Sequence, residues 1–336
     1  MARILVTGAA GFIGSHCARA LLSRGDDVTG IDNFNDFYDP TIKEAQAREL
    51  SAHARFRLVR GSILDPAARD ACFAGESFDG VIHLAAWAGV RPSIQRPALY
   101  QRENIEGTVA LMDAMRLVAE ERASSLPKLV FASSSSVYGC NKKVPFAETD
   151  FVDEPISPYA ATKKACELLC HTYHHLYGLD VACLRFFTVY GPGQRPDLAI
   201  HKFARLMMSG EPIPRYGDGS TSRDYTYIDD VIQGVLAALD RTTGYRVYNL
   251  GNHRTVTLHT LIESLSAALG VTPKIQEMPM QAGDVPQTWA DISRAQAELG
   301  YRPTTPFDVG IQKFAAWYKD WHERGLSSSG SIDKAD

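Results

Sequence analysis

Short apolar runs alternate with longer polar and amphipathic segments along the first 187 residues. Runs rich in Val, Ile, Leu and Phe recur at 3–7, 27–31, 56–59, 79–85, 128–132 and 180–186. Helices are predicted between them, at 14–24, 40–50, 97–119 and 159–176. Because short apolar runs separated by helices are typical of strands buried on both faces, this alternation predicts an α/β fold with a parallel, doubly wound, Rossmann-type sheet.

The pattern changes after residue 187, where Pro and Gly become frequent and the apolar runs shorten. Basic residues and tyrosines stand close together there: Lys202, Arg215, Tyr216, Arg223, Tyr225 and Tyr227. With helices predicted at 229–239, 258–269 and 307–318, we expect a second, smaller α/β lobe that binds an anionic, aromatic ligand. Solvated loop charges would give the same composition. The predicted domains are 1–187 and 188–325, the latter with some return of chain to the first, followed by a disordered tail at 326–336.

Composition narrows the classes of partner. The 336 residues carry a net charge of −4 with the signs interspersed, so we expect no basic surface for a nucleic acid and no polybasic cluster beside a membrane. We also expect no metal site. The six cysteines form no CxxC pair and favour a reducing cytoplasm. The chain enters a strand directly at its start, so we expect neither a signal peptide nor a membrane anchor.

A glycine-rich turn joins the first predicted strand to the first helix, at Gly8, Gly11 and Gly14. Glycines there let the backbone approach a pyrophosphate, while the first helical N–H groups and the helix dipole face its charge. Asp32 ends the second strand, where a carboxylate can accept a hydrogen bond from a ribose hydroxyl. The combination predicts a dinucleotide site, and Asp32 would repel a 2′-phosphate, so NAD is favoured over NADP.

Two further stretches follow predicted strands at the same edge of the sheet. In the stretch 85–89, Ala-Ala-Trp-Ala-Gly, the small residues would let a flat ligand lie against the backbone, although tight packing would explain them equally well. The serine run 133–136 would place hydroxyl donors near a substrate, although a flexible loop is the alternative. Because ligands of doubly wound sheets bind beyond the carboxyl ends of the strands, we favour a functional role for both.

Tyr159 and Lys163 are one turn apart at the start of a predicted helix. A cation a few ångströms away favours phenolate over phenol, so Tyr159 is predicted to act as a general base. A solvent-exposed Tyr and Lys would be the ordinary explanation for this pair alone. The glycine turn, Asp32 and the serine run make catalysis the better one.

Together these motifs identify residues 1 to about 320 as resembling the extended short-chain dehydrogenase/reductase family. Within it the chain is most similar to UDP-glucuronate 4-epimerases, through NFNDFYDP at 33–40, RFFTVYGP at 185–192, RPD at 195–197 and GDV at 283–285. The resemblance implies interconversion of UDP-glucuronate and UDP-galacturonate through a 4-keto sugar, with tightly bound NAD. It also implies a homodimer that pairs through helices 97–119 and 159–176.

The resemblance assigns roles to individual residues. It implies catalysis by Tyr159, Lys163 and Ser134. The cofactor-binding residues would be Gly8, Gly11, Phe12, Ile13, Gly14, Asp32, Asn33, Ile63, Leu84, Ala85, Ala86, Tyr159 and Lys163. The substrate-binding residues would be Ser135, Ser136, Arg91, Thr188, Arg195, Arg223 and Asp284, with Arg223 on the diphosphate, Asp284 on the uridine ribose and Arg195 near the sugar carboxylate.

Three positions bear on the alternatives. Ser62 stands where relatives carry an Asp that contacts the adenine. Gln281 replaces an Arg of UDP-glucose 4-epimerases, which argues against that activity. UDP-glucuronate decarboxylases and 4,6-dehydratases place an acid where this chain has Ser136. A cofactor-bound sensor or scaffold is the non-enzymatic alternative, and an intact Ser134, Tyr159 and Lys163 set argues against it.

Overall fold

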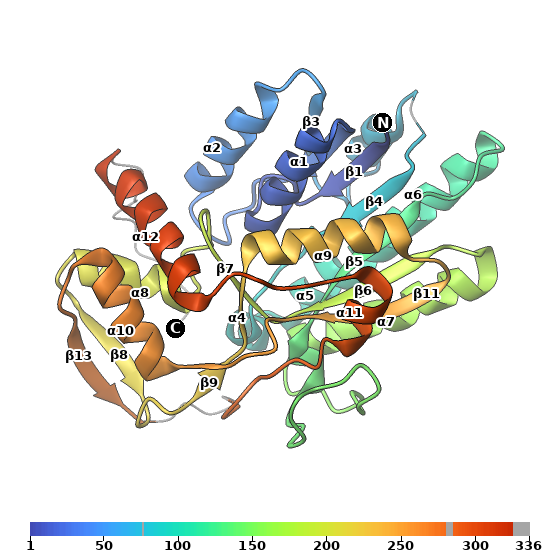
Figure 1. Ribbon diagram of the computed structural model, residues 1–336. Helices are drawn as coiled ribbons and strands as arrows, with labels where there is room; N and C mark the ends of the chain where they lie inside the picture. Colours follow the sequence, from blue (N-terminus) through green and yellow to red (C-terminus); the bar gives the residue numbers. More distant parts are fainter. Residues whose placement is uncertain (76, 280–284, 325–336) are drawn as a thin grey trace.

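A large parallel sheet forms the centre of the molecule (Figure 1), as a computed structural model shows for residues 1–75, 77–279 and 285–324. Within these residues, seven strands pair in parallel. In sheet order they are β11 (Tyr245–Leu250), β6 (Val181–Phe186), β5 (Lys128–Ser134), β4 (Gly80–His83), β1 (Arg3–Thr7), β2 (Asp27–Asp32) and β3 (Phe56–Arg60). The predicted doubly wound parallel fold is confirmed.

Helices cover both faces of this sheet (Figure 1). One face packs against α1 (Phe12–Arg24), α2 (Pro40–Ser51) and α9 (Ile228–Arg241), and the other against α3 (Pro66–Phe73), α6 (Gly107–Glu121) and α7 (Pro158–Tyr177). Successive residues of β5 alternate between the two cores: Val130 and Ala132 face α1 and α9, whereas Leu129 and Phe131 face α6 and α7. Burial on both faces explains why the strands are continuous apolar runs.

All six predicted strands of the sheet are present, but the seventh, β11, was not predicted. Its sequence, YRVYNL, interrupts the apolar run with Arg246 and Asn249. It pairs with β6 from Tyr245 opposite Val181 to Leu250 opposite Phe186. Asn249 is buried because its side-chain amide donates to the carbonyls of Phe146 and Asp291, at 2.8 and 3.0 Å. Tertiary contacts therefore supply the partners that its polar sequence needs.

The helix predicted at 97–119 is observed as three successive segments. It begins as α5 (Pro97–Tyr100), widens into a π-helix (Gln101–Glu106) and continues as α6. Asn104, in the π segment, donates from its side chain to the carbonyl of Trp87 at 3.1 Å and to the Thr162 hydroxyl at 3.0 Å. A π turn near a ligand cavity is a common functional distortion, and here it turns a polar side chain toward α7.

A smaller group of elements lies beside the carboxyl edge of the sheet (Figure 1). It comprises α8 (Ala199–Met208), β8 (Pro212–Tyr216), β9 (Ser222–Arg223), β12 (Val256–Thr257), α10 (Leu258–Leu269), β13 (Lys274–Met278) and α12 (Phe307–Glu323). Its strands form two-stranded ladders, β13 with β8 and β12 with β9. β7 (Thr188–Tyr190) and β10 (Tyr225–Tyr227) pair in parallel and lead from the sheet into this group.

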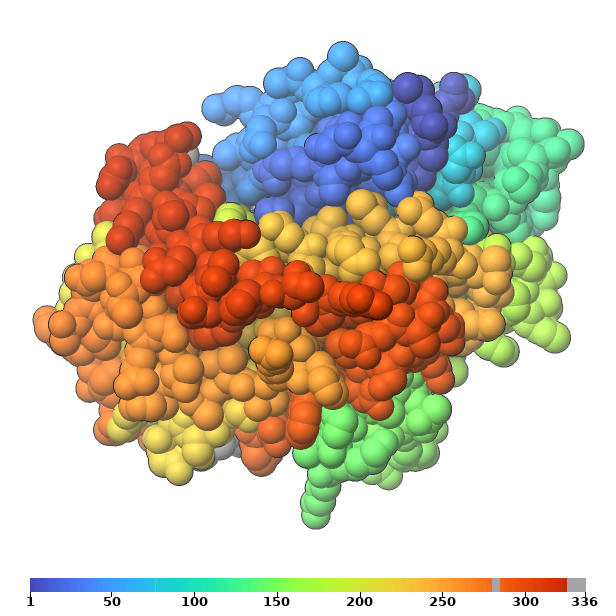
Figure 2. Space-filling view, in the orientation of Figure 1, coloured from blue at the N-terminus to red at the C-terminus, as the bar shows by residue number. Residues whose placement is uncertain are grey.

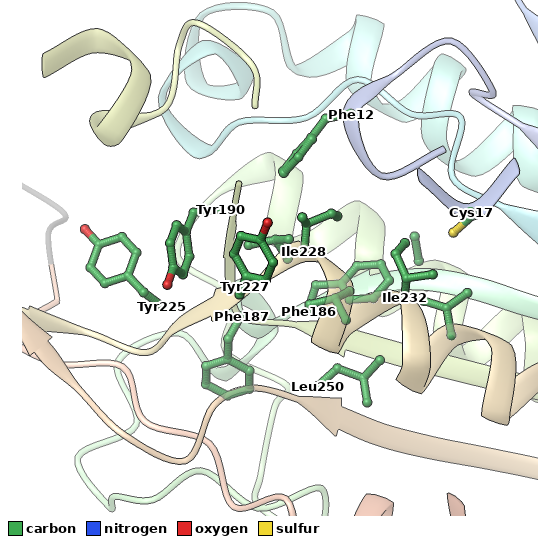
Figure 3. Close-up of a cluster of buried hydrophobic side chains, with 14 of the residues drawn as sticks. Phe12, Cys17, Phe186, Phe187, Tyr190, Tyr225, Tyr227, Ile228, Ile232 and Leu250 are labelled. Atoms are coloured by element: carbon green, nitrogen blue, oxygen red, sulfur yellow. The ribbon is translucent and has the colours of Figure 1, made fainter. Parts of the chain in front are cut away.

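An aromatic cluster joins the two parts (Figure 3). The Tyr190 ring packs edge-on against Tyr225 and Tyr227, with ring centroids 6.2 and 5.7 Å apart. Gly310 lies so close to the Tyr190 hydroxyl that a Cβ would overlap it. The tyrosines that the sequence suggested as ligand contacts at 225 and 227 are thus core residues, 6% and 3% exposed.

The C-terminal segment spans both parts. From α11 (Ser293–Leu299), which packs against β11 and α9, the chain crosses the front of the molecule to α12 (Figure 2). Asp230 of α9 holds this crossing by accepting from the Thr304 and Thr305 N–H groups, at 3.1 and 3.0 Å. Near the end of α12, Trp321 packs with Ile42 of α2 and with Tyr38, which precedes that helix.

Some predictions lie outside the described residues: Gln281, Asp284, most of the 283–285 motif and the tail at 326–336. Among the helices of the described part, none is long and apolar enough to cross a membrane.

Candidate active site

One large cavity, of about 1120 Å³, lies between the carboxyl edge of the sheet and the smaller group of elements. Its walls contain every described residue to which the resemblance assigned a role: Gly8, Gly11, Phe12, Ile13, Gly14, Asp32, Asn33, Ile63, Leu84, Ala85, Ala86, Arg91, Ser134, Ser135, Ser136, Tyr159, Lys163, Thr188, Arg195 and Arg223. Segments separated by more than 200 residues therefore share one space, whose volume is at the upper end of the range usual for ligand sites.

The glycine turn lines the part of the cavity next to the sheet. Gly8 has a φ of +68°, and a Cβ there would stand 2.9 Å from the backbone nitrogen of Ala85. A Cβ on Gly14 would overlap the Gly8 carbonyl oxygen. Helix α1 starts after Gly11 without a side-chain cap, which leaves its first N–H groups for an anionic ligand.

Asp32 lies at the end of β2 and is 7% exposed. Its carboxylate accepts from the N–H of Ala10 at 3.0 Å and from the N–H of Phe34 at 2.9 Å. These two bonds tie the glycine turn to the loop after β2 and fix the carboxylate at the cavity wall. Phe34 itself has a φ of +51°, so the loop turns sharply away from β2.

A buried lysine beside this loop was not singled out from the sequence. Lys43 of α2 is 5% exposed, and its Nζ donates to the carbonyl and to the side-chain oxygen of Asn35, at 2.9 and 2.8 Å. Burial lowers the pKa of Lys43, with the Asp32 carboxylate opposing that shift. Nothing in the polar sequence of α2 distinguishes Lys43 from a solvent-exposed lysine.

Behind the Leu84–Ala86 stretch, a buried chain of hydrogen bonds fixes the end of β4. The Thr7 hydroxyl accepts from the N–H groups of Leu84 and Ala85, at 3.1 and 3.0 Å, so its own proton points to His83 Nδ1, 2.7 Å away. His83 Nε2 then donates to the Thr108 hydroxyl at 3.0 Å. Burial, followed by the charge of Lys163, lowers the pKa of His83 to about 3, so the ring is neutral.

The four serines after β5 have different roles. Ser133 is 2% exposed, and its hydroxyl donates to Glu167 Oε1 at 2.6 Å. Arg185 donates two hydrogen bonds to the Glu167 carboxylate, at 2.9 and 2.8 Å. Arg185 also donates to the Tyr138 hydroxyl at 3.1 Å. This buried network ties Ser133 to α7 through Glu167, and it ties Tyr138, two residues after the last serine, to β6 through Arg185.

Ser134, Ser135 and Ser136 are partly exposed at the cavity. The Ser134 oxygen accepts from the Ser136 N–H at 3.2 Å and from the Ser136 hydroxyl at 2.9 Å. With both of these bonds directed into it, the Ser134 oxygen keeps its own proton for a third partner in the cavity. The Ser134 hydroxyl can therefore donate to a ligand in the cavity.

Tyr159 and Lys163 lie in the first turns of α7, opposite the serines. Ser157 caps this helix by accepting from the Ala160 N–H at 3.1 Å, and the Tyr159 N–H donates to Ser93 Oγ at 3.1 Å. Lys163 Nζ donates to the Ala132 carbonyl at 2.7 Å and stands 5.8 Å from the centroid of the Tyr159 ring. The predicted closeness of the Tyr159 ring and the ammonium is present, and Lys163 is 4% exposed.

Arg195 enters the cavity on the loop after β7, and it already has a partner. Its Nε and Nη2 donate to the two carboxylate oxygens of Asp197, at 3.0 and 2.8 Å, and its guanidinium lies 5.5 Å from the centroid of the Phe37 ring. Burial would lower the pKa of Arg195, but the Asp197 carboxylate outweighs burial and the pKa is raised. Asp197 was not nominated for a role.

The remaining nominated residues line the far end of the cavity. Arg91 of α4 (Val90–Gln95) lies 6.0 Å from the centroid of the Tyr216 ring. Arg223 donates to the carbonyl of Ser222 at 2.9 Å. Fully buried Asp224 fixes this wall: its carbonyl accepts from the Thr188 N–H at 3.0 Å.

The Asp224 carboxylate connects two further segments. It accepts from the N–H groups of Asn252 at 2.6 Å, His253 at 3.2 Å and Ala290 at 3.1 Å. Trp87, Lys202 and Tyr216, which belong to stretches that the sequence analysis singled out, also line the cavity. Sequence reasoning missed Arg205 and Thr288, which line it as well. Their distance along the chain from the recognisable motifs left no local signal for them. Among the described residues, no group of three or more His, Cys, Asp and Glu side chains could hold a metal ion.

Comparisons with known proteins agree with this arrangement. A family model of GDP-mannose 4,6 dehydratase matches residues 5–314. UDP-glucuronate 4-epimerase 1 of Arabidopsis thaliana is 46% identical over 337 aligned positions, covering 95% of this chain and 77% of the relative.

Two crystal structures extend the comparison. The UDP-glucuronic acid 4-epimerase of Bacillus cereus, in complex with UDP-glucuronic acid and NAD, superposes with a TM-score of 0.87 at 37% identity, covering 95% of this chain and 99% of the other. The UDP-glucose 4-epimerase of Thermotoga maritima, with UDP-glucose, superposes with a TM-score of 0.84 at 31% identity, covering 95% of this chain and 99% of the other.

Proposed function

Because the chain belongs to the GDP-mannose 4,6-dehydratase-like family of extended short-chain dehydrogenases/reductases, we propose that it is an NAD-dependent UDP-glucuronate 4-epimerase. The observation that carries the proposal is the single cavity in which Tyr159, Ser134 and Arg195 meet the glycine turn. The relatives named as UDP-glucuronate 4-epimerases support the choice of substrate.

The residues at the sheet end fit NAD. The backbone around Gly8 and Gly14 leaves no room for a Cβ, and the uncapped start of α1 offers N–H groups to a pyrophosphate. Asp32 would bind a ribose hydroxyl, and Lys163 a hydroxyl of the other ribose. When bound, NAD supplies a hydride acceptor for C4 of the sugar and returns the hydride later in the cycle.

Tyr159 is the proposed general base and acid. It would take the proton of the C4 hydroxyl as the ketone forms and give it back when the opposite face of the ketone is reduced. Lys163, held by the Ala132 carbonyl, places a positive charge on the side of the phenolate. Ser134 would donate to the C4 oxygen and steady it through both half-reactions, between which the sugar turns over.

Glucuronate adds a hazard that glucose lacks, because its 4-ketone is a β-keto acid. If the C5–carboxylate bond aligns with the carbonyl π system, its electron pair passes into an enolate and carbon dioxide leaves. A proton from solvent then adds to C5. An epimerase must hold the carboxylate out of this alignment, and we assign that task to Arg195, whose charge and planar donors suit a carboxylate.

Products decide between this proposal and its rivals. Incubation of the purified enzyme with UDP-glucuronate, followed by NMR, should yield UDP-galacturonate with little carbon dioxide and without added NAD. The same assay with UDP-glucose should show much slower turnover. Release of mostly decarboxylated product would favour a UDP-glucuronate decarboxylase, and faster turnover of UDP-glucose would favour a UDP-glucose 4-epimerase.

We also propose that the enzyme is a cytoplasmic homodimer that pairs through α6 and α7. These helices expose large apolar side chains on their outer surfaces: Leu117 at 53%, Leu168 at 57%, Leu176 at 59% and Tyr177 at 44%. Exposed apolar residues gathered on two neighbouring helices favour burial by a second copy. The six unpaired cysteines, Cys140 exposed among them, suit a reducing compartment. Sedimentation of wild type and of a Leu168→Glu variant would test the pairing.

A further inference from the structure

The guanidinium of Arg195 is oriented by a residue for which the proposed reaction has no direct use. We propose that Asp197 is a positioning residue that holds Arg195 so that its terminal nitrogens face the sugar carboxylate, and thereby keeps the 4-keto intermediate from decarboxylating. The inference rests on the proposed function. Asp197 and Arg195 both line the cavity, and their side chains are 25% and 21% exposed.

The geometry of the pair leaves Arg195 with donors to spare. A guanidinium has five N–H donors in one plane. Asp197 takes the Nε proton and one Nη2 proton, on the side edge of that plane. The second Nη2 proton and an Nη1 proton then form a fork at the end of the group, which matches the spacing of a second carboxylate. Asp197 and the substrate can therefore be bound together, with Asp197 fixing the plane that the substrate meets.

The loop around the pair is held from several sides, which makes such fixing effective. His16 of α1 lies 2.9 Å from the Pro192 carbonyl through Nε2, and His201 of α8 lies 2.6 Å from the Gln194 carbonyl through Nδ1. Phe37, from the loop after β2, lies under the guanidinium. Because the loop backbone and the Phe37 ring are held in this way, the Arg195 side chain has little freedom to leave the orientation that the Asp197 carboxylate gives it.

Asp197 also sets the charge of the subsite. Paired with Asp197, Arg195 presents directed hydrogen bonds with little net charge, so it orients a carboxylate more than it attracts one. Without Asp197 the guanidinium keeps its charge but can rotate. We therefore expect substrate binding to survive the loss of Asp197, while control of the carboxylate torsion does not.

The test is the ratio of decarboxylated to epimerised product from UDP-glucuronate, followed by NMR together with NADH absorbance. Asp197→Ala should raise this ratio about tenfold, which is the effect of losing one good charge-assisted bond. NADH should accumulate in step with carbon dioxide, since a decarboxylated ketone that leaves does not take the hydride back. KM should fall or stay constant while kcat for epimerisation falls.

Two further variants complete the experiment. Asp197→Asn keeps the shape and one acceptor, so it should give an intermediate ratio even if the Ala variant folds poorly. Asp240→Asn is the matched control, because Asp240 pairs with Arg24 Nη1 at 2.9 and 2.8 Å on the surface, and its ratio should equal that of wild type.

An unchanged ratio in both Asp197 variants, or a raised KM with both products slowed equally, would overturn the positioning role while leaving the epimerase proposal intact. A wild-type enzyme that turns over no UDP-glucuronate, or mainly decarboxylates it, would overturn both.

Discussion

The glycine turn and the 191–197 loop contribute to the wall of the same cavity by different means. The turn presents backbone: at Gly8 and Gly14 there is no space for a side chain, and the ligand would meet N–H groups. The loop presents side chains, and its chief cation, Arg195, is aimed by another side chain of the same loop. At Gly8 and Gly14 the backbone site has no room for an added Cβ, whereas the orientation of a side chain such as Arg195 can be changed by replacing its partner.

The largest effect is expected at the backbone wall. Gly14→Ala would drive a Cβ into the Gly8 carbonyl oxygen, so the turn must open. We expect the purified variant to retain almost no NAD, measured after acid release. Gly11→Ala is the graded comparison, since its Cβ would stand 3.1 Å from the same oxygen and should leave part of the NAD bound. Equal retention by both variants would contradict the steric argument.

Removal of the proposed base comes next. Tyr159→Phe should lower kcat by at least about 100-fold while NAD content and thermal stability stay near wild type, because a positioned base contributes that much. Tyr100→Phe is the control: its hydroxyl donates to the Ala88 carbonyl at 2.6 Å, and its ring packs edge-on against Tyr159 at 6.3 Å. It should lower kcat far less. If Tyr159→Phe kept most of the wild-type activity, Tyr159 could not be the general base.

A smaller effect is expected at Asp32. Asp32→Ala loses a charge-assisted bond of roughly 1.5–3 kcal/mol, so NAD should bind about 10- to 100-fold more weakly and the preference over NADP should relax. Titration calorimetry with both cofactors measures this. Asp26→Ala is the control, since that buried carboxylate binds the Ala2 N–H at 3.0 Å and Arg24 Nε at 2.6 Å. It should affect stability and leave cofactor choice unchanged.

The smallest effect is expected at two buried histidines outside the cavity lining, His83 at the end of β4 and His201 of α8, which contacts the Gln194 carbonyl. Burial lowers the folded-state pKa of His83 to about 3 and of His201 to about 4, from 6.5. Between these values the unfolded chain binds more protons, so stability is full above pH 6.5 and is lost as the pH falls toward the folded pKa. When the pH falls from 7.5 to 5, each buried histidine should lower the free energy of unfolding by about 2 kcal/mol.

Urea unfolding of His83→Gln and His201→Gln at the two pH values checks this, and each variant should lose less stability on acidification than wild type. His175→Gln, at an exposed position of α7, is the control. If the control flattened the pH dependence as much as the buried variants, the assignment would be wrong.

The sequence predicted the backbone wall better than the side-chain wall, for a physical reason. The turn, Asp32, Tyr159 and Lys163 lie at short, fixed spacings, so local geometry alone brings each pair together. In contrast, Ser133 and Ser134 are neighbours of the same type, and what distinguishes them is that the Ser133 hydroxyl donates to Glu167, a residue of another element.

Other features depended on contacts that no local pattern encodes. The loop after β2 makes Lys43 a buried cavity residue, and the pairing with Arg195 gives Asp197 its place. Strand β11 was missed because its polar positions find their partners, Phe146 and Asp291, far away in the chain.

The place of β11 in the chain has a consequence for synthesis on the ribosome. The strand that closes the edge of the sheet next to β6 spans Tyr245–Leu250, so three-quarters of the chain must emerge before the sheet is complete. Until then β6 has a free edge, which is a template for pairing with other nascent chains. A fragment ending near residue 187 would keep that edge permanently, and we expect it to aggregate even though it contains the glycine turn and Tyr159.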